Sequence, residues 1–101
     1  MNRRSLDLSM SIQRIAVLGA GQMGNGITQV AACAGYEVTM IDIQQDYVDN
    51  GMACIRKSLE KLVSKERMTQ EEATSALPRT FASVERSSAA NADLVVEAIP
   101  E

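Results

Sequence analysis

The sequence contains no histidine and no tryptophan, and only 3% of its residues are aromatic. Its two cysteines, Cys33 and Cys54, are far from a C-x-x-C spacing, and without histidine they lack the usual partners of a metal site. We therefore expect no metal, and two reduced thiols that behave as small apolar residues. Reduced thiols are typical of a cytoplasmic protein.

The chain also lacks a basic excess and a long apolar run. Its formal net charge is −3, which disfavours non-specific binding to nucleic acid. No run of about 18 apolar residues is present, so we expect no membrane span. With 101 residues, of which 46% are hydrophobic and 23% charged, the composition is that of one small globular domain. Residues 1–13 are expected to form a flexible extension.

A glycine-rich loop, Gly19-Ala20-Gly21-Gln22-Met23-Gly24, has the pattern G-x-G-x-x-G. An apolar run predicts a strand over 14–18 before it, and helical spacing predicts a helix over 22–34 after it. A lone G-x-G-x-x-G is often an ordinary turn, but between a strand and a helix it indicates dinucleotide binding. The helix is expected to face the sheet through its apolar stripe, which consists of Met23, Ile27, Val30, Ala31 and Ala34.

Each glycine of this loop has an expected mechanical role. Gly19 allows the sharp turn from the strand, Gly21 lets the backbone approach a pyrophosphate, and Gly24 lets the helix lie close to the strand. The first turn of the helix then presents unpaired N–H groups and the positive end of its dipole to the phosphates.

A second strand, predicted over 36–41, ends at Asp42. Dinucleotide sites place an acidic residue about 20 positions beyond the loop, where it accepts hydrogen bonds from the adenosine ribose. Asp42 fits that position. The residues at 43–45 include no arginine or lysine to meet a 2′-phosphate, so we expect NAD rather than NADP.

The remaining pattern predicts an α/β fold, namely an incomplete, Rossmann-type doubly wound parallel sheet. A long helix over 46–65 and a short one over 70–77, ended by Pro78, form a helix hairpin after strand two. Thr69 and Glu72 have the spacing of a capping box. Strands over 79–84 and 94–99, with a helical turn over 87–92 between them, complete the order strand–helix–strand–helix–helix–strand–(helix)–strand.

The expected strand order is 3-2-1-4, which places strand four beside strand one at the crevice where such folds bind ligands. Its carboxyl end, Ala98 to Glu101, should border the cofactor. The long helix buries Val48, Met52, Ile55, Leu59 and Leu62.

The opposite face of the long helix carries Lys57, Lys61 and Lys65, with Ser58 beside them. On the pattern alone, a solvated face is the default interpretation, and the alternative is a stripe that binds the phosphates of an anionic substrate.

Residues 14–101 resemble the NAD-binding domain of 3-hydroxyacyl-CoA dehydrogenases. The similarity rests on Gly19 to Ile27, on Asp42, on the lysine-bearing hairpin, and on Ala92 to Glu101. The resemblance implies NAD as cofactor and oxidation of the 3-hydroxyl of an acyl-CoA. It also implies cofactor contacts at Gly19, Ala20, Gly21, Gln22, Met23, Gly24, Asp42, Ala98, Ile99 and Glu101, and contacts to coenzyme A at Ser58 and Lys65.

The chain departs from this family in having no histidine, whereas the family's catalytic base is a histidine held by a glutamate. The resemblance therefore implies a truncated cofactor-binding part, inactive alone, of an enzyme of fatty acid or butanoate metabolism that is a homodimer when complete. Two alternatives remain open, namely a non-catalytic NAD-binding or redox-sensing module and another Rossmann dehydrogenase.

Overall fold

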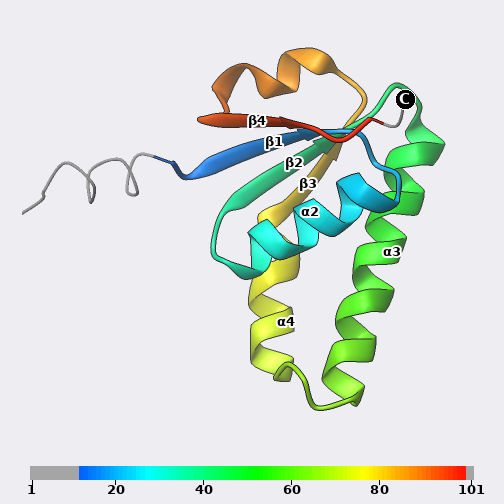
Figure 1. Cartoon of the computed structure of the whole chain (residues 1–101), viewed down its shortest axis with the longest axis vertical. Coiled ribbons are helices and arrows are strands. Elements are labelled where there is room, and N and C mark those ends of the chain that lie inside the picture. Colours follow the sequence, from blue (N-terminus) through cyan, green and yellow to red (C-terminus); the bar gives the residue numbers. More distant parts are fainter. Residues whose placement is uncertain (1–11, 100–101) are drawn as a thin grey trace, which may run out of the picture.

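The computed structural model describes residues 12–99, so all of the predicted extension except residues 12 and 13 lies outside them. Its centre is a parallel sheet of four strands in the order β3-β2-β1-β4 (Figure 1). The predicted strand order and incomplete Rossmann-type fold are thus confirmed. The strands are β1 (Arg14–Leu18), β2 (Glu37–Ile41), β3 (Thr80–Ser83) and β4 (Leu94–Glu97).

The helices follow the predicted order with small shifts at their ends. They are α2 (Gln22–Cys33), α3 (Gln45–Ser64), α4 (Gln70–Ala76), and the 3₁₀ helices η1 (Leu77–Arg79) and η2 (Arg86–Asn91). Pro78 was expected to end the short helix, but it lies within η1, which continues directly from α4. The fixed φ of proline suits the first turn of a helix, where its missing N–H costs nothing.

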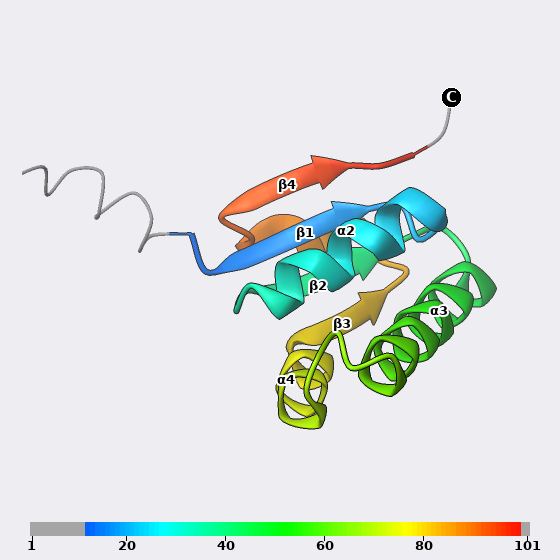
Figure 2. The ribbon, with the colours of Figure 1, turned by 60° about the horizontal axis from the view of Figure 1, so that its bottom comes forward.

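Three apolar clusters show how the sheet is covered. Alternate residues of β1 and β2 point to opposite faces, so Val17 and Val38 pack with α2, and Met40 packs with α3. Ala16 and Ile41 lie on the other face, against η2. Figure 2 shows α2, α3 and α4 on one side of the sheet, with η2 behind it.

The predicted sheet-facing stripe of α2 is partly wrong. Met23 and Val30 were expected to face the sheet, yet their side chains are 62% and 70% exposed. The helix is rotated so that its small residues lie inward, because a Cβ on Gly24 would be 1.9 Å from the carbonyl oxygen of Gly19. This close approach leaves no room for long side chains. The fully buried residues of α2 are Gly24, Thr28 and Ala32.

The hairpin agrees better with its prediction. Val48, Ile55 and Leu59 are buried on α3, as its periodicity predicts, whereas Met52 and Leu62 are only half-buried. The predicted capping box of α4 is present, with Thr69 and Glu72 each accepting a hydrogen bond from the other's backbone N–H.

Candidate dinucleotide-binding site

The loop after β1 turns sharply at Gly19, whose φ is +123°. Its N–H donates to the carbonyl of Ile41 at 2.7 Å, which ties the loop to the end of β2. A Cβ at Gly19 would lie 2.7 Å from the carbonyl oxygen of Ala98, at the end of β4. Glycine is therefore required here both by the backbone conformation and by the neighbouring chain.

Gly21 differs from Gly19 in that the protein itself does not require a glycine there. It is the N-cap of α2 with φ −70°, and apart from its chain neighbours, no atom of residues 12–99 lies within 4 Å of the position that a Cβ would occupy. The α2 N-terminus has no side-chain cap and no acidic residue in its first turn. Its first N–H groups, which an α-helix leaves unpaired, thus suit an anion at this open position.

Asp42 lies at the end of β2, where the loop spacing predicts it. One carboxylate oxygen accepts the N–H of Ala20 at 2.8 Å, and the other accepts the N–H of Ile43 at 2.7 Å. The predicted ribose acceptor therefore also fixes the loop. An ionised carboxylate has about four acceptor sites, so these two bonds leave capacity for hydroxyl groups of a ligand.

Asn25 was not singled out by the sequence. Its side-chain amide donates to the carbonyl of Gly21 at 2.8 Å and reaches that of Ala20 at 3.4 Å. Both contacts fix the loop carbonyls on the helix side. Asparagine has a low helix propensity because its side chain bonds to nearby backbone groups. Its presence in the first turns of a predicted helix is the signal that could have identified Asn25.

The carboxyl end of β4 lies beside the loop, as predicted. The N–H of Ala98 donates to the carbonyl of Leu18 at 2.8 Å, and Ala98 is buried, whereas Ile99 is 58% exposed. Gln22 and Met23 are exposed in the first turn of α2, next to Gly21. The predicted contact of Glu101 lies outside the described residues.

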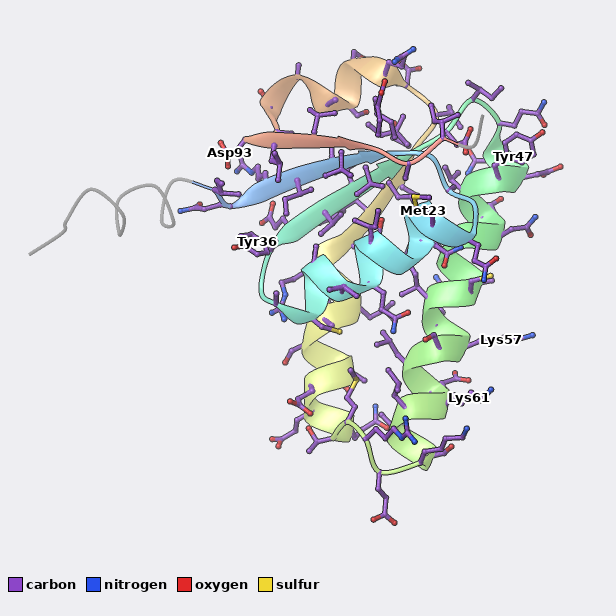
Figure 3. The ribbon with its side chains drawn as sticks, viewed as in Figure 1. Met23, Tyr36, Tyr47, Lys57, Lys61 and Asp93 are labelled. Atoms are coloured by element: carbon purple, nitrogen blue, oxygen red, sulfur yellow. The ribbon has the colours of Figure 1, made fainter. Side chains whose placement is uncertain are left out.

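Of the three lysines predicted to form a stripe on α3, two line the same hollow and the third does not. Lys57 and Lys61 extend away from the helix into solvent (Figure 3). They share an open hollow with Ser58, whereas Lys65 lies beyond it as the C-cap residue of α3. Within residues 12–99 these lysines form no ion pair, but Glu60 lines the same hollow. Ser58 is half-buried and the three lysines are exposed.

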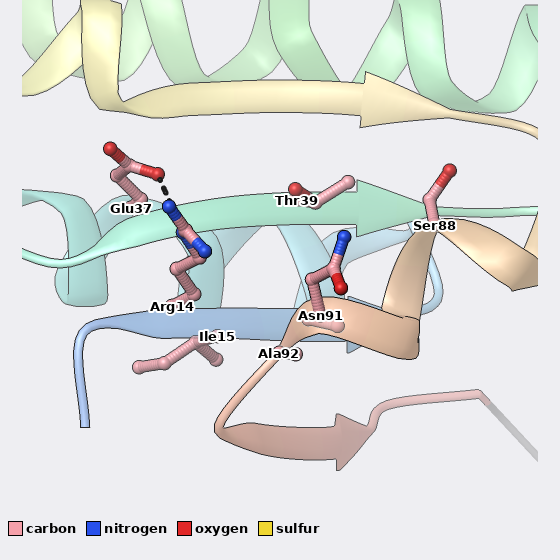
Figure 4. A pocket seen from close by; sticks show the side chains of 8 residues that line it. Arg14, Ile15, Glu37, Thr39, Ser88, Asn91 and Ala92 are labelled. Carbon is pink, nitrogen blue, oxygen red and sulfur yellow. Dashed lines mark ion pairs between the residues drawn. The ribbon is translucent and has the colours of Figure 1, made fainter. Parts of the chain in front are cut away.

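A polar hollow at the amino ends of the strands was not predicted (Figure 4). It opens beside η2, and its rim carries an ion pair between Arg14 and Glu37 at 3.4 Å. Thr39 and Asn91 line it as well. The carboxylate of nearby Asp93 accepts the N–H groups of Gln13 and Arg14, and these hydrogen bonds hold its pKa below its usual range. Two backbone N–H groups at this end of the sheet are thus paired by a side chain of the protein.

The other sequence expectations can be compared with residues 12–99 only. Cys33 and Cys54 are free thiols there, and both are exposed. Partial burial of the thiol of Cys33 raises its pKa above the usual value. In the described part of the chain, no cluster of acidic, histidine or cysteine side chains could hold a metal ion. None of the helices in that part is long and apolar enough to cross a membrane.

The parallel sheet, the glycine loop at a helix N-terminus and the acidic end of β2 define a dinucleotide-binding domain of the doubly wound class. Residues 14–101 match the family model described as 3-hydroxyacyl-CoA dehydrogenase, NAD binding domain. The chain belongs to this family, which confirms the resemblance and NAD as the cofactor.

Curated relatives agree with this assignment. The 3-hydroxybutyryl-CoA dehydrogenase of Bradyrhizobium diazoefficiens is 44% identical over 90 residues, covering 89% of this chain and 31% of that protein. A probable 3-hydroxybutyryl-CoA dehydrogenase of Bacillus subtilis is 40% identical, covering 91% of this chain and 32% of that protein. The chain thus spans about a third of the length of these relatives.

Solved structures give the same result for the fold. The crystal structure of (S)-3-hydroxybutyryl-CoA dehydrogenase from Ralstonia eutropha superposes with a TM-score of 0.85 at 39% identity, over 89% of this chain and 32% of that one. The 3-hydroxybutyryl-CoA dehydrogenase from Escherichia coli K12 has a TM-score of 0.85 at 34% identity, over 89% of this chain and 19% of that one.

Proposed function

We propose that the protein carrying this chain is an NAD-dependent dehydrogenase that oxidises the 3-hydroxyl of an acyl-CoA to the 3-keto form. The observation that carries the cofactor part of this proposal is Gly21. It is a glycine that neither its φ nor its neighbours require, placed at an uncapped helix N-terminus. A ligand that approaches the backbone supplies the missing reason for it.

In this proposal the site residues have separate roles. The loop from Gly19 to Gly24, with Ala20, Gly21, Gln22 and Met23 between, holds the pyrophosphate. Asp42 accepts hydrogen bonds from the adenosine ribose, and Ala98, Ile99 and Glu101 border the nicotinamide end. When bound, NAD accepts the hydride from the carbon that carries the hydroxyl. The histidine base of the family is absent from these 101 residues, so we propose that they are inactive alone.

The acyl-CoA substrate is supported by the hairpin. Exposed lysines that form no ion pair with residues 12–99 suit the phosphates of coenzyme A, and half-buried Ser58 offers a hydroxyl beside them. Ser58 and Lys65 are the proposed contacts. The hollow next to Ser58 makes Lys57 and Lys61 additional sources of positive charge for the same ligand.

The wider setting of the protein belongs to the same proposal. We infer fatty acid or butanoate oxidation, including β-oxidation, from the acyl-CoA substrate. A cytoplasmic location is supported by the two free cysteines. Homodimerisation of the complete enzyme rests on the family resemblance.

The test is Gly21→Val in the full-length protein, followed by titration with NADH. Because the space around Gly21 is open, the variant should stay folded, with only the loss of stability that valine causes at an N-cap, and yet lose NADH binding. Gly26→Val is the matched control, since a Cβ at Gly26 also meets no atom within 4 Å. Near-normal NADH affinity in folded Gly21→Val would contradict the proposed site.

A further inference from the structure

Helix α3 passes against the back of the glycine loop at Gly51. A Cβ on Gly51 would lie 2.9 Å from the carbonyl oxygen of Ala20 and 2.7 Å from the Cε atom of Met40. Real Cβ contacts are longer than this, so either neighbour would have to move. Met40 is fully buried, and Ala20 is 4% exposed. The loop therefore has its present position only because α3 has no side chain here.

No other feature of Gly51 calls for glycine. It lies in the interior of α3 and is not among the glycines with positive φ. In a helix interior, glycine is about 1 kcal/mol less favourable than alanine. Helix propensity thus opposes Gly51, and the contact with Ala20 and Met40 is what favours it.

The peptide that α3 contacts is fixed from several sides. The N–H of Ala20 donates to Asp42 at 2.8 Å, while its carbonyl oxygen faces Gly51 and the side-chain amide of Asn25. The next residue is Gly21, where the open position at the α2 N-terminus begins. A shift of the Ala20 carbonyl therefore rotates the Ala20–Gly21 peptide, whose N–H belongs to the anion-facing group.

We propose that Gly51 is a positioning residue for NAD binding. By letting α3 approach the Ala20 carbonyl, it sets the direction in which the loop N–H groups point toward the pyrophosphate. The inference rests on the proposed role of the loop. Helix α3 would then have two functions, namely to position the cofactor loop through Gly51 and to contact coenzyme A through its lysines.

The experiment compares three variants of the full-length protein by NADH fluorescence titration and thermal unfolding. Gly51→Ala should raise the Kd for NADH by about tenfold, the scale of one weakened hydrogen bond to a charged group. The matched control, Gly26→Ala in α2, adds the same methyl group to a helix interior where nothing lies within 4 Å. It should leave the Kd unchanged.

The third variant, Gly51→Ala with Met40→Val, separates positioning from packing. In Gly51→Ala alone, the added methyl group meets the Sδ and Cε atoms of Met40, which should lower the unfolding temperature. Valine lacks both atoms, so the unfolding temperature of the double variant should return toward that of wild type. The Kd for NADH should stay raised, because the Ala20 contact remains. Recovery of both quantities together would overturn the proposal, and so would a wild-type Kd in Gly51→Ala.

Gly21→Val, titrated in parallel, distinguishes this inference from the proposal on which it rests. If Gly21→Val loses NADH binding while Gly51→Ala binds like wild type, only the positioning role is wrong. If Gly21→Val itself binds normally, the role of the loop is wrong and the inference fails with it.

Discussion

Replacing Asp42 by asparagine should destabilise the glycine loop and reduce the preference for NADH over NADPH. The carboxylate accepts the N–H groups of Ala20 and Ile43 on separate oxygens. Asparagine keeps one oxygen and puts an NH₂ group in place of the other. One backbone N–H would then face a donor, whichever way the amide is turned.

The size of the effect follows from these two hydrogen bonds. A hydrogen bond to a charged acceptor contributes about 1.5–3 kcal/mol, and Asp42 is half-buried, so solvent screens part of it. We expect Asp42→Asn to lower the free energy of unfolding by about 1–2 kcal/mol. Removing the charge also removes its repulsion of a 2′-phosphate, so the Kd for NADH should rise by about tenfold and that for NADPH by less.

The assay combines urea unfolding with titrations of NADH and NADPH on the same preparations. Ile43→Ala is the control, since this side chain is 77% exposed and its backbone N–H is kept. It should match wild type in stability and in both dissociation constants. An unchanged ratio of NADH to NADPH affinity in Asp42→Asn would show that the carboxylate does not select the cofactor.

Two further changes test other parts of the chain. Lys65→Ala with Ser58→Ala should raise KM for acyl-CoA by about tenfold or less at unchanged kcat, with a smaller rise at high salt. Arg86→Ala on η2 is the control. Wild-type kinetics of the double variant at low salt would show that the lysine-bearing face of α3 is only solvated and does not bind coenzyme A. At Asp93, hydrogen bonds from the N–H groups of Gln13 and Arg14 lower the carboxyl pKa, so the carboxylate stabilises the fold above its unfolded pKa. Wild type should therefore unfold at a higher temperature than Asp93→Asn near neutral pH, and this difference should disappear as the pH falls through the lowered pKa of the folded state. A difference that stays constant down to a pH of about 2 would refute this.

The element order could be predicted because its signals are local. Strands β1 and β4 are mainly apolar runs, and the α4 cap needs only Thr69 and Glu72. The rotation of α2 could not be predicted from apolar periodicity, which favours Met23 and Val30, although the glycine fingerprint does predict the close approach at Gly24. The deciding contact joins Gly24 to Gly19, and it concerns the absence of a side chain.

The site shows the same division. Spacing along the chain was sufficient to locate the loop, Asp42 and the end of β4. It could not show that Asp42 bonds to Ala20, 22 residues away, or that Gly51 contacts the Ala20 carbonyl from α3. The first contact depends on how β1 pairs with β2, and the second on where α3 packs against the loop. The roles predicted for individual site residues remain predictions.

The two ends of the sheet differ in how they treat backbone N–H groups. At the amino end, Asp93 accepts two of them, and away from the sheet, at the tip of the hairpin, α4 begins with a complete capping box. At the carboxyl end, α2 begins at Gly21 with no side-chain cap, although a serine, threonine or aspartate there would contribute roughly a few tenths of a kcal/mol more than glycine. The N-terminus of α2 thus keeps its first backbone N–H groups beside the glycine loop, where a bound anion can accept their hydrogen bonds. That difference is the physical argument for cofactor binding at the carboxyl end.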